Sequence, residues 1–190
     1  MKIAILYFSG YGHTAKQAEA VHAGAASVAG SEATLYRIDE EGNISDATWE
    51  ALGAADAIIY GTPTYMAGPA WQFKKVADAS SKPWYSQVWK NKIAAGFTNS
   101  ASVNGDKGFT IDYLFHLSMQ HSQIWVGTGE MPRNAKAHGP DDVNWTAGFA
   151  GAMAISPSDA SPDEAPRKGD LETARLLGAR VATLAGKMAK

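Results

Sequence analysis

A short run of glycine and hydroxyl-bearing residues follows the first apolar segment of the chain. This run, Ser9-Gly10-Tyr11-Gly12-His13-Thr14, comes directly after Ile3–Phe8. Where a strand passes into a helix, backbone N–H groups and the helix dipole attract an anion, and hydroxyls add further donors. The run holds no Lys or Arg and lacks the Gly-Lys-Ser/Thr ending of a nucleoside triphosphate loop. It predicts an anion site, with an ordinary tight turn as the alternative.

The same residues allow two phosphate-binding interpretations. Gly10-x-Gly12-x-x-Ala15 matches the dinucleotide fingerprint, with alanine in the place of the third glycine. That fingerprint expects an acidic residue about 20 positions further on, whereas the acidic run Asp39-Glu40-Glu41 falls later. Ser9 and Thr14 place one hydroxyl on each side of the turn. We therefore favour a cradle for a single phosphate, as in a mononucleotide.

Two later loops carry residues suited to a flat polar ligand. In Gly61–Pro69, proline and glycine residues restrict the backbone path, while Tyr65 and Met66 offer a flat and a polarizable surface. Thr98–Asp106 is rich in small polar side chains, which suits close approach of its backbone to a planar ligand. Each loop on its own is also explained as an ordinary connection between a strand and a helix.

These loops need elements that bring them together. Near-continuous apolar runs predict strands covered on both faces, as in a parallel sheet, over Ile3–Phe8, Ala33–Ile38, Ala57–Gly61, Lys92–Phe97 and Gln123–Val126. Apolar residues at helical spacing predict helices over Thr14–Ala29, from Pro69 onward and from Leu171 onward. The alternation predicts an α/β fold with a flavodoxin-like, doubly wound, five-stranded parallel sheet of order 2-1-3-4-5 and helices on both faces.

The predicted topology places the three loops at one edge of the sheet. Ligands of such sheets bind beyond the carboxyl ends of the strands, at the switch point between strands 1 and 3. We interpret residues 1–190 as a single domain. Within it, residues 130–169 form a long irregular excursion rich in Pro and Gly, with a weak helical pattern around Ala147–Ile155.

Composition excludes several classes of function. The net charge of −2 leaves no basic surface for nucleic acid. The absence of Cys excludes disulfides, thiolate catalysis and zinc–cysteine sites, and no residue spacing predicts a metal site. No apolar stretch approaches the roughly 20 residues of a membrane span, and the first apolar run is too short for a signal peptide. We expect a cytoplasmic globular protein.

Together these segments resemble a known family. The chain is similar to the flavodoxin-like NAD(P)H:quinone oxidoreductases of the WrbA type and to the related flavin mononucleotide (FMN) reductases, over nearly its whole length. The resemblance lies in Ser9–Thr14, in Gly61–Thr64, in Trp84 ahead of Lys92–Phe97, and in His121 just before the last predicted strand. The chain departs from the family pattern after Thr64, where Tyr-Met-Ala-Gly replaces the common Arg-Phe-Gly-Asn.

The resemblance implies a role for each loop. The first loop would hold the FMN phosphate through Ser9, Tyr11, Gly12, His13 and Thr14. The second would hold the isoalloxazine ring through Pro63, Thr64, Tyr65 and Met66. The third would border the pyrimidine side of the ring through Thr98, Asn99 and Ser100. By the same resemblance, His121 lies at the flavin edge as the one candidate catalytic residue, and Tyr11 and Trp84 flank the place where nicotinamide or quinone docks.

Two of these residues have a second interpretation from the sequence itself. Trp84 lies among Trp71, Tyr85 and Trp89, and an aromatic cluster of this kind is typical of packing or of an oligomer contact. His121 is equally suited to cap or pack the end of a helix. For His13, a backbone role at the start of a helix is favoured over a role for the imidazole ring.

The function implied by the resemblance is that of an FMN-dependent oxidoreductase. It would transfer hydride from NAD(P)H, through bound FMN, to quinone-like acceptors, and the flavin would carry the redox chemistry. The resemblance also implies a homodimer or homotetramer. The main alternative is a flavodoxin-type FMN electron carrier without its own NAD(P)H turnover; a third is a module that uses the flavin as a sensor. A shuttle usually relies on a charged face, which a net charge of −2 does not supply.

Overall fold

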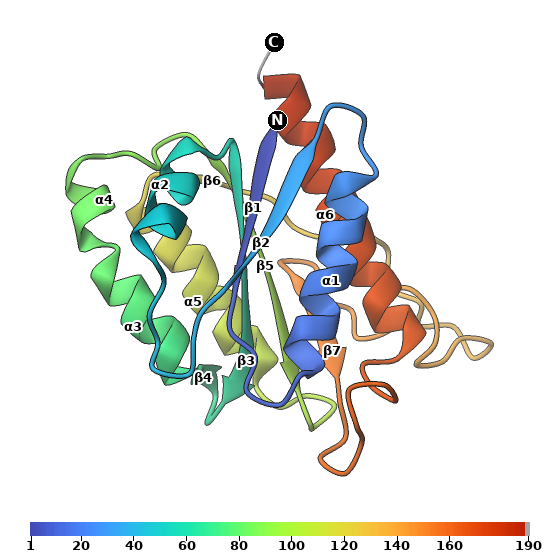
Figure 1. The fold of residues 1–190 in the computed structure, drawn as a ribbon. Helices are drawn as coiled ribbons and strands as arrows, with labels where there is room; N and C mark the ends of the chain where they lie inside the picture. The colour runs from blue at the N-terminus through green and yellow to red at the C-terminus, as the bar shows by residue number, and fades with distance from the viewer. Residues whose placement is uncertain (189–190) are drawn as a thin grey trace.

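The computed structural model describes residues 1–188, so the last two residues of the predicted domain lie outside it. Strands and helices alternate along most of the chain (Figure 1). The strands are β1 Lys2–Tyr7, β2 Glu32–Arg37, β3 Ala57–Tyr65, β4 Gly68–Pro69, β5 Ile93–Ser100, β6 Ile124–Trp125 and β7 Ala152–Ile155. The helices are α1 His13–Ala26, α2 Asp46–Ala54, α3 Trp71–Ala79, α4 Ser81–Tyr85, α5 Lys107–Gln120 and α6 Lys168–Met188. No helix in this part of the chain is long and apolar enough to cross a membrane.

The sheet has the predicted order. Its parallel core runs β2-β1-β3-β5-β6, which confirms the flavodoxin-like arrangement 2-1-3-4-5. The fifth position is divided between two short strands, because β6 pairs with the start of β5 at Ile93 and Ala94 while β7 pairs with its end from Phe97 to Ser100. The predicted excursion, residues 130–169, therefore starts between the two parts of the fifth strand and contains the second part, β7. The helical pattern around Ala147–Ile155 is wrong, since Ala152–Ile155 is β7.

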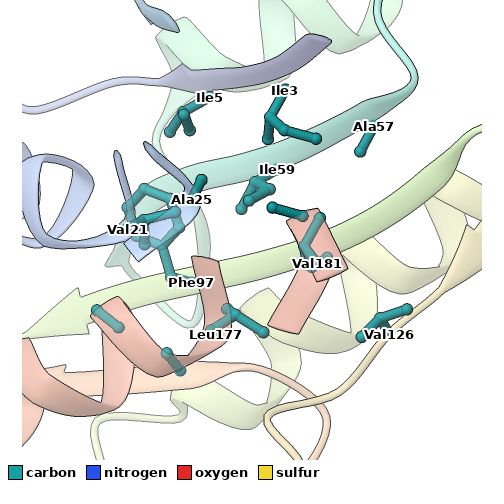
Figure 2. Close-up of a cluster of buried hydrophobic side chains, with 14 of the residues drawn as sticks. Ile3, Ile5, Val21, Ala25, Ala57, Ile59, Phe97, Val126, Leu177 and Val181 are labelled. Atoms are coloured by element: carbon teal, nitrogen blue, oxygen red, sulfur yellow. The ribbon is translucent and has the colours of Figure 1, made fainter. Parts of the chain in front are cut away.

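Helices cover both faces of the sheet, as the near-continuous apolar strands require. In Figure 1, α1 and α6 lie on one face, and α2, α3 and α5 on the other. Each face has its own hydrophobic cluster. Figure 2 shows the cluster beneath α1 and α6, where strand residues such as Ile5, Ile59 and Phe97 meet Val21 and Leu177 from the two helices.

Two glycines let α1 and α6 pack backbone against backbone. A Cβ at Gly24 would lie 1.8 Å from the carbonyl oxygen of Arg175, and a Cβ at Gly178 would lie 2.0 Å from that of Val21. Real carbon–oxygen contacts cannot be this short, so only glycine permits this approach of the helices. Because α1 begins at the first predicted loop, this packing also sets where that loop lies.

We expect the substitution Gly178→Ala to lower the free energy of unfolding by about 1–3 kcal/mol, since the added methyl forces the two helices apart. Gly108→Ala is the matched control, because Gly108 also lies in a helix and a Cβ there would meet nothing else within 4 Å among residues 1–188. That variant should leave the free energy unchanged or raise it by less than about 1 kcal/mol. Urea denaturation followed by circular dichroism measures both; equal effects would contradict this account of the packing.

Candidate functional site

A cavity of about 620 Å³ opens at the edge of the sheet where the parallel strands end. The three predicted loops meet there, as the topology requires. A fourth segment, residues 156–167, also contributes and is called the covering loop below. The cavity is lined by Tyr11, His13, Thr14, Pro63, Thr64, Tyr65, Asn99, Ser100, Ala101, Ser156, Pro157, Ser158, Ala160 and Pro162.

Ser9 shapes the first loop from beneath. Its side chain is buried, and its Oγ accepts hydrogen bonds from the backbone N–H groups of Gly12 and Ala15, both at 3.1 Å. Gly12 has φ of 92°, a left-handed conformation that glycine adopts without strain. Gly12 is followed at once by α1. Ser9 and Gly12 therefore act on the path of the backbone, and neither lines the cavity.

The start of α1 presents unpaired donors to the cavity. His13 and Thr14 are the first two residues of the helix, so their N–H groups have no acceptor within it. Thr14 is 2% exposed and lines the cavity, and its hydroxyl is a further hydrogen-bonding group at the start of the helix. None of the cavity-lining side chains in this part of the chain is a Lys or an Arg. Amides, a hydroxyl and the helix dipole thus make an anion site without a cation.

The covering loop closes over the first loop. His13 Nδ1 donates a hydrogen bond to the carbonyl oxygen of Ala165 at 2.9 Å, which fixes the proton on that nitrogen because a carbonyl only accepts. Lys16 Nζ lies 3.1 Å from Asp163 in an exposed ion pair. Pro162 lies close to Gly12: a Cβ added at Gly12 would be 2.6 Å from Cγ of Pro162. The imidazole of His13 is therefore an anchor for this loop as well as part of the cavity wall.

The second loop is a hairpin under backbone strain. Thr64 pairs with Pro69 and Tyr65 with Gly68, which leaves Met66 and Ala67 as the two loop residues. Their φ values are 47° and 64°, the combination a type I′ turn requires and one that costs a residue other than glycine about 1 kcal/mol or more. Met66 is fully exposed at the tip and does not line the cavity.

Threonine hydroxyls fix the floor between the second and third loops. Thr64 Oγ1 lies 2.8 Å from the hydroxyls of both Thr98 and Thr110, and Thr98 Oγ1 donates to the carbonyl oxygen of Thr62 at 2.7 Å. Thr98 is fully buried by these bonds, so it supports the site from below and does not line it. Asn99 does line the cavity, with its Oδ1 accepting a hydrogen bond from Ser156 at 2.9 Å.

Two aromatic rings stand at the mouth of the cavity. The ring centroids of Tyr11 and Tyr65 are 6.2 Å apart at an angle of 70°, in an edge-to-face arrangement. Tyr11 is 77% exposed. The Tyr65 hydroxyl lies close to Gly10, since a Cβ added at Gly10 would be 2.7 Å from that oxygen. Burial raises the pKa of Tyr65, so its phenol stays protonated. The two rings offer flat apolar surface to a planar ligand.

His121 and Trp84 do not reach this cavity. Helix α5 runs back from the carboxyl edge, so His121, directly after its end, lies at the opposite edge of the sheet, and Trp84 in α4 lies beside it. His121 is 4% exposed and bonded to Ser80 through Nε2 at 2.8 Å, and burial lowers its pKa to about 4. Within this chain neither residue lines the cavity. His121 packs at the end of α5, as its second interpretation has it, whereas Trp84 is 46% exposed and its role in an oligomer contact stays a prediction.

The covering loop is not predicted by the sequence. Its only signal was the length of the excursion and its proline content, which do not say where the segment lies. The residues it adds to the cavity are Ser156, Pro157, Ser158, Ala160 and Pro162.

The arrangement joins an anion site to a slot for a flat ring. Within residues 1–188, no three His, Cys, Asp or Glu side chains are grouped so that they could hold a metal ion. The geometry suits a ligand with a phosphate at one end and an aromatic ring system at the other.

The sequence of the chain is similar to those of known proteins. A sequence profile of the NADPH-dependent FMN reductase family matches residues 1–132. Flavodoxin FldP of Pseudomonas aeruginosa is 46% identical over 96% of each chain. An NAD(P)H dehydrogenase (quinone) of Syntrophobacter fumaroxidans is 30% identical over the full length of both.

A solved structure shows the same relationship. The flavodoxin, WrbA-like protein of Agrobacterium tumefaciens is 49% identical over 98% of each chain, with a TM-score of 0.79. The fold, the family profile and these relatives agree: the chain belongs to the NADPH-dependent FMN reductase family, among its flavodoxin-like members of the WrbA type.

Proposed function

We propose that this protein is an FMN-dependent oxidoreductase that transfers hydride from NAD(P)H to quinone-like acceptors. The observation that carries the proposal is the cavity in which a cation-free anion site meets a slot bordered by two tyrosines. The family and the quinone-reductase relatives support the same activity.

The residues present fit FMN. A phosphate would accept hydrogen bonds from the N–H groups of His13 and Thr14, which have no acceptor within the helix, and from the Thr14 hydroxyl. The isoalloxazine would lie along Pro63–Tyr65, with Asn99 and Ser100 on the other side. The acidic run Asp39-Glu40-Glu41 falls later than the dinucleotide fingerprint expects, which favours one compact phosphate over the pyrophosphate of a dinucleotide.

When bound, FMN supplies the two-electron redox chemistry: it accepts hydride from NAD(P)H and returns two electrons to the acceptor, which takes up two protons. The chain positions the ring and excludes water from its buried side. Tyr11 is exposed at the mouth, where it offers a face to an incoming nicotinamide or quinone. His13 holds the covering loop closed through Ala165. Within this chain His121 lies at the opposite edge of the sheet, and the titratable side chains that line the cavity are Tyr11, His13 and Tyr65.

An electron carrier is the second candidate, and one observation favours it: the relative at 46% identity is named a flavodoxin. A carrier and an oxidoreductase share the FMN site and differ in whether NAD(P)H reduces the bound flavin. The dimer or tetramer implied by the resemblance stays a prediction.

We expect Thr14→Val to weaken FMN binding roughly 10- to 100-fold, the loss of one hydrogen bond to a charged group, and to leave riboflavin binding unchanged. Riboflavin carries the same ring without the phosphate. Fluorescence titration of the apoprotein with each ligand measures the dissociation constants, with Thr34→Val on the exposed face of β2 as control. Equal loss of both ligands would show that Thr14 does not contact the phosphate.

We also expect the FMN-loaded protein to sustain NADH or NADPH oxidation with benzoquinone in the absence of any added reductase. Absorbance at the nicotinamide band follows the reaction, and free FMN at the same concentration is the control. Bound FMN without turnover on either nucleotide would reject the oxidoreductase and select the carrier. Failure to bind FMN at all would reject both.

A further inference from the structure

Lys107 is a buried lysine whose ammonium is enclosed by the third loop. The residue is 1% exposed although it is the first residue of α5. Its Nζ donates to Ser100 Oγ at 2.9 Å, to the carbonyl oxygen of Ser102 at 2.8 Å and to that of Val103 at 2.9 Å. These acceptors use all three protons of an ammonium group. The loop is therefore folded around a positive charge.

This charge lies directly behind the cavity wall. Ser100 lines the cavity and is the residue that Lys107 contacts by its side chain. One hydroxyl thus separates the ammonium from the space where a ligand would lie. A cation at the N-terminus of a helix is opposed by the helix dipole, and burial adds a further cost. The three acceptors offset these costs.

The charge of a buried carboxylate, Asp170, acts on the Lys107 ammonium. Asp170, in the first turn of α6, is 5% exposed, and its Oδ2 accepts a hydrogen bond from the N–H of Ile155 at 2.9 Å. Ile155 precedes Ser156, which also lines the cavity. Burial lowers the pKa of Lys107 to about 8 and raises that of Asp170 to about 6, and each is partly offset by the charge of the other. At pH 7 both groups are therefore mainly charged.

We propose that Lys107 is a positioning residue that holds the third loop against the cavity and places a positive charge there which favours reduced FMN over oxidised FMN, while Asp170 limits this preference. The proposal rests on the proposed function, since it concerns the flavin that the cavity would hold. Two-electron reduction adds negative charge to the ring system. A fixed cation beyond a thin wall stabilises that charge without contacting it.

The test compares the dissociation constants of reduced and oxidised FMN, because their ratio reports the reduction potential of the bound flavin. We expect Lys107→Met to raise the ratio of reduced to oxidised dissociation constant about tenfold, the scale expected for a unit charge about 10 Å away at an effective dielectric constant of about 20. Asp170→Asn should change the ratio in the opposite direction. This variant removes the charge and keeps an acceptor for the N–H of Ile155.

Anaerobic titration of each apoprotein at pH 7 gives the two constants, and a redox-dye equilibration gives the potential independently. Lys90→Met, which removes an exposed lysine just before the start of β5, at the opposite edge of the sheet from the cavity, is the charge-matched control and should leave the ratio unchanged. If Lys107→Met does not fold, Asp170→Asn decides alone, and an unchanged or raised ratio there overturns the proposal. If the role of Lys107 were purely structural, Lys107→Met would weaken the binding of reduced and oxidised FMN equally. Wild-type protein that binds neither form would instead reject the proposed function.

Discussion

The close contact between α1 and α6 sets the relative position of two loops that line the cavity. Gly24 and Gly178 allow two helix backbones to approach without side chains between them. The N-terminal end of α1 carries the anion site, and the N-terminal end of α6 receives the covering loop. Since both loops are attached to the same rigid pair of helices, the two walls of the anion site are positioned by one packing contact.

Buried hydroxyl groups of Ser and Thr residues fix the loops around the cavity by hydrogen bonds. Ser9 satisfies two backbone N–H groups with a single oxygen, and the cluster around Thr64 and Thr98 ties three elements together beneath the floor. Each of these groups is buried and paired, which makes them costly to remove and rigid in place. The resulting site is preorganised, because its donors need not move to meet a ligand.

The sequence was most informative where local patterns and topology agree. Apolar runs and helical spacing predicted the order of the sheet, and the rule for the carboxyl edge then brought Thr14, Tyr65 and Asn99 into one cavity. Side-chain direction was not predictable in this way. Ser9, Thr98 and Met66 belong to the right loops, yet two are turned into the protein and one into solvent, and a sequence pattern does not distinguish these outcomes.

The positions of His121, the covering loop and Lys107 were not predicted from the sequence, because they depend on how distant segments of the chain are brought together. His121 lies close in sequence to the last strand, but α5 has by then carried the chain back to the opposite edge. The covering loop has no periodic pattern, and its position follows only from β7, a short strand hidden in the excursion. Lys107 resembles an ordinary surface lysine in the sequence, because nothing local indicates that the third loop closes around it.

The divided fifth strand also bears on how the protein can be re-engineered. The intervening segment is closed at its base, where the N–H of Thr128 bonds to the carbonyl oxygen of Phe149 at 3.0 Å and its hydroxyl to that of Gly148 at 2.8 Å. The residues between Thr128 and Gly148 therefore form a loop whose two ends are held together. The entropic cost of closing such a loop grows only with the logarithm of its length. The outer part of that segment is thus a permissive position for inserted peptides or reporter domains, at a fixed place beside the sheet.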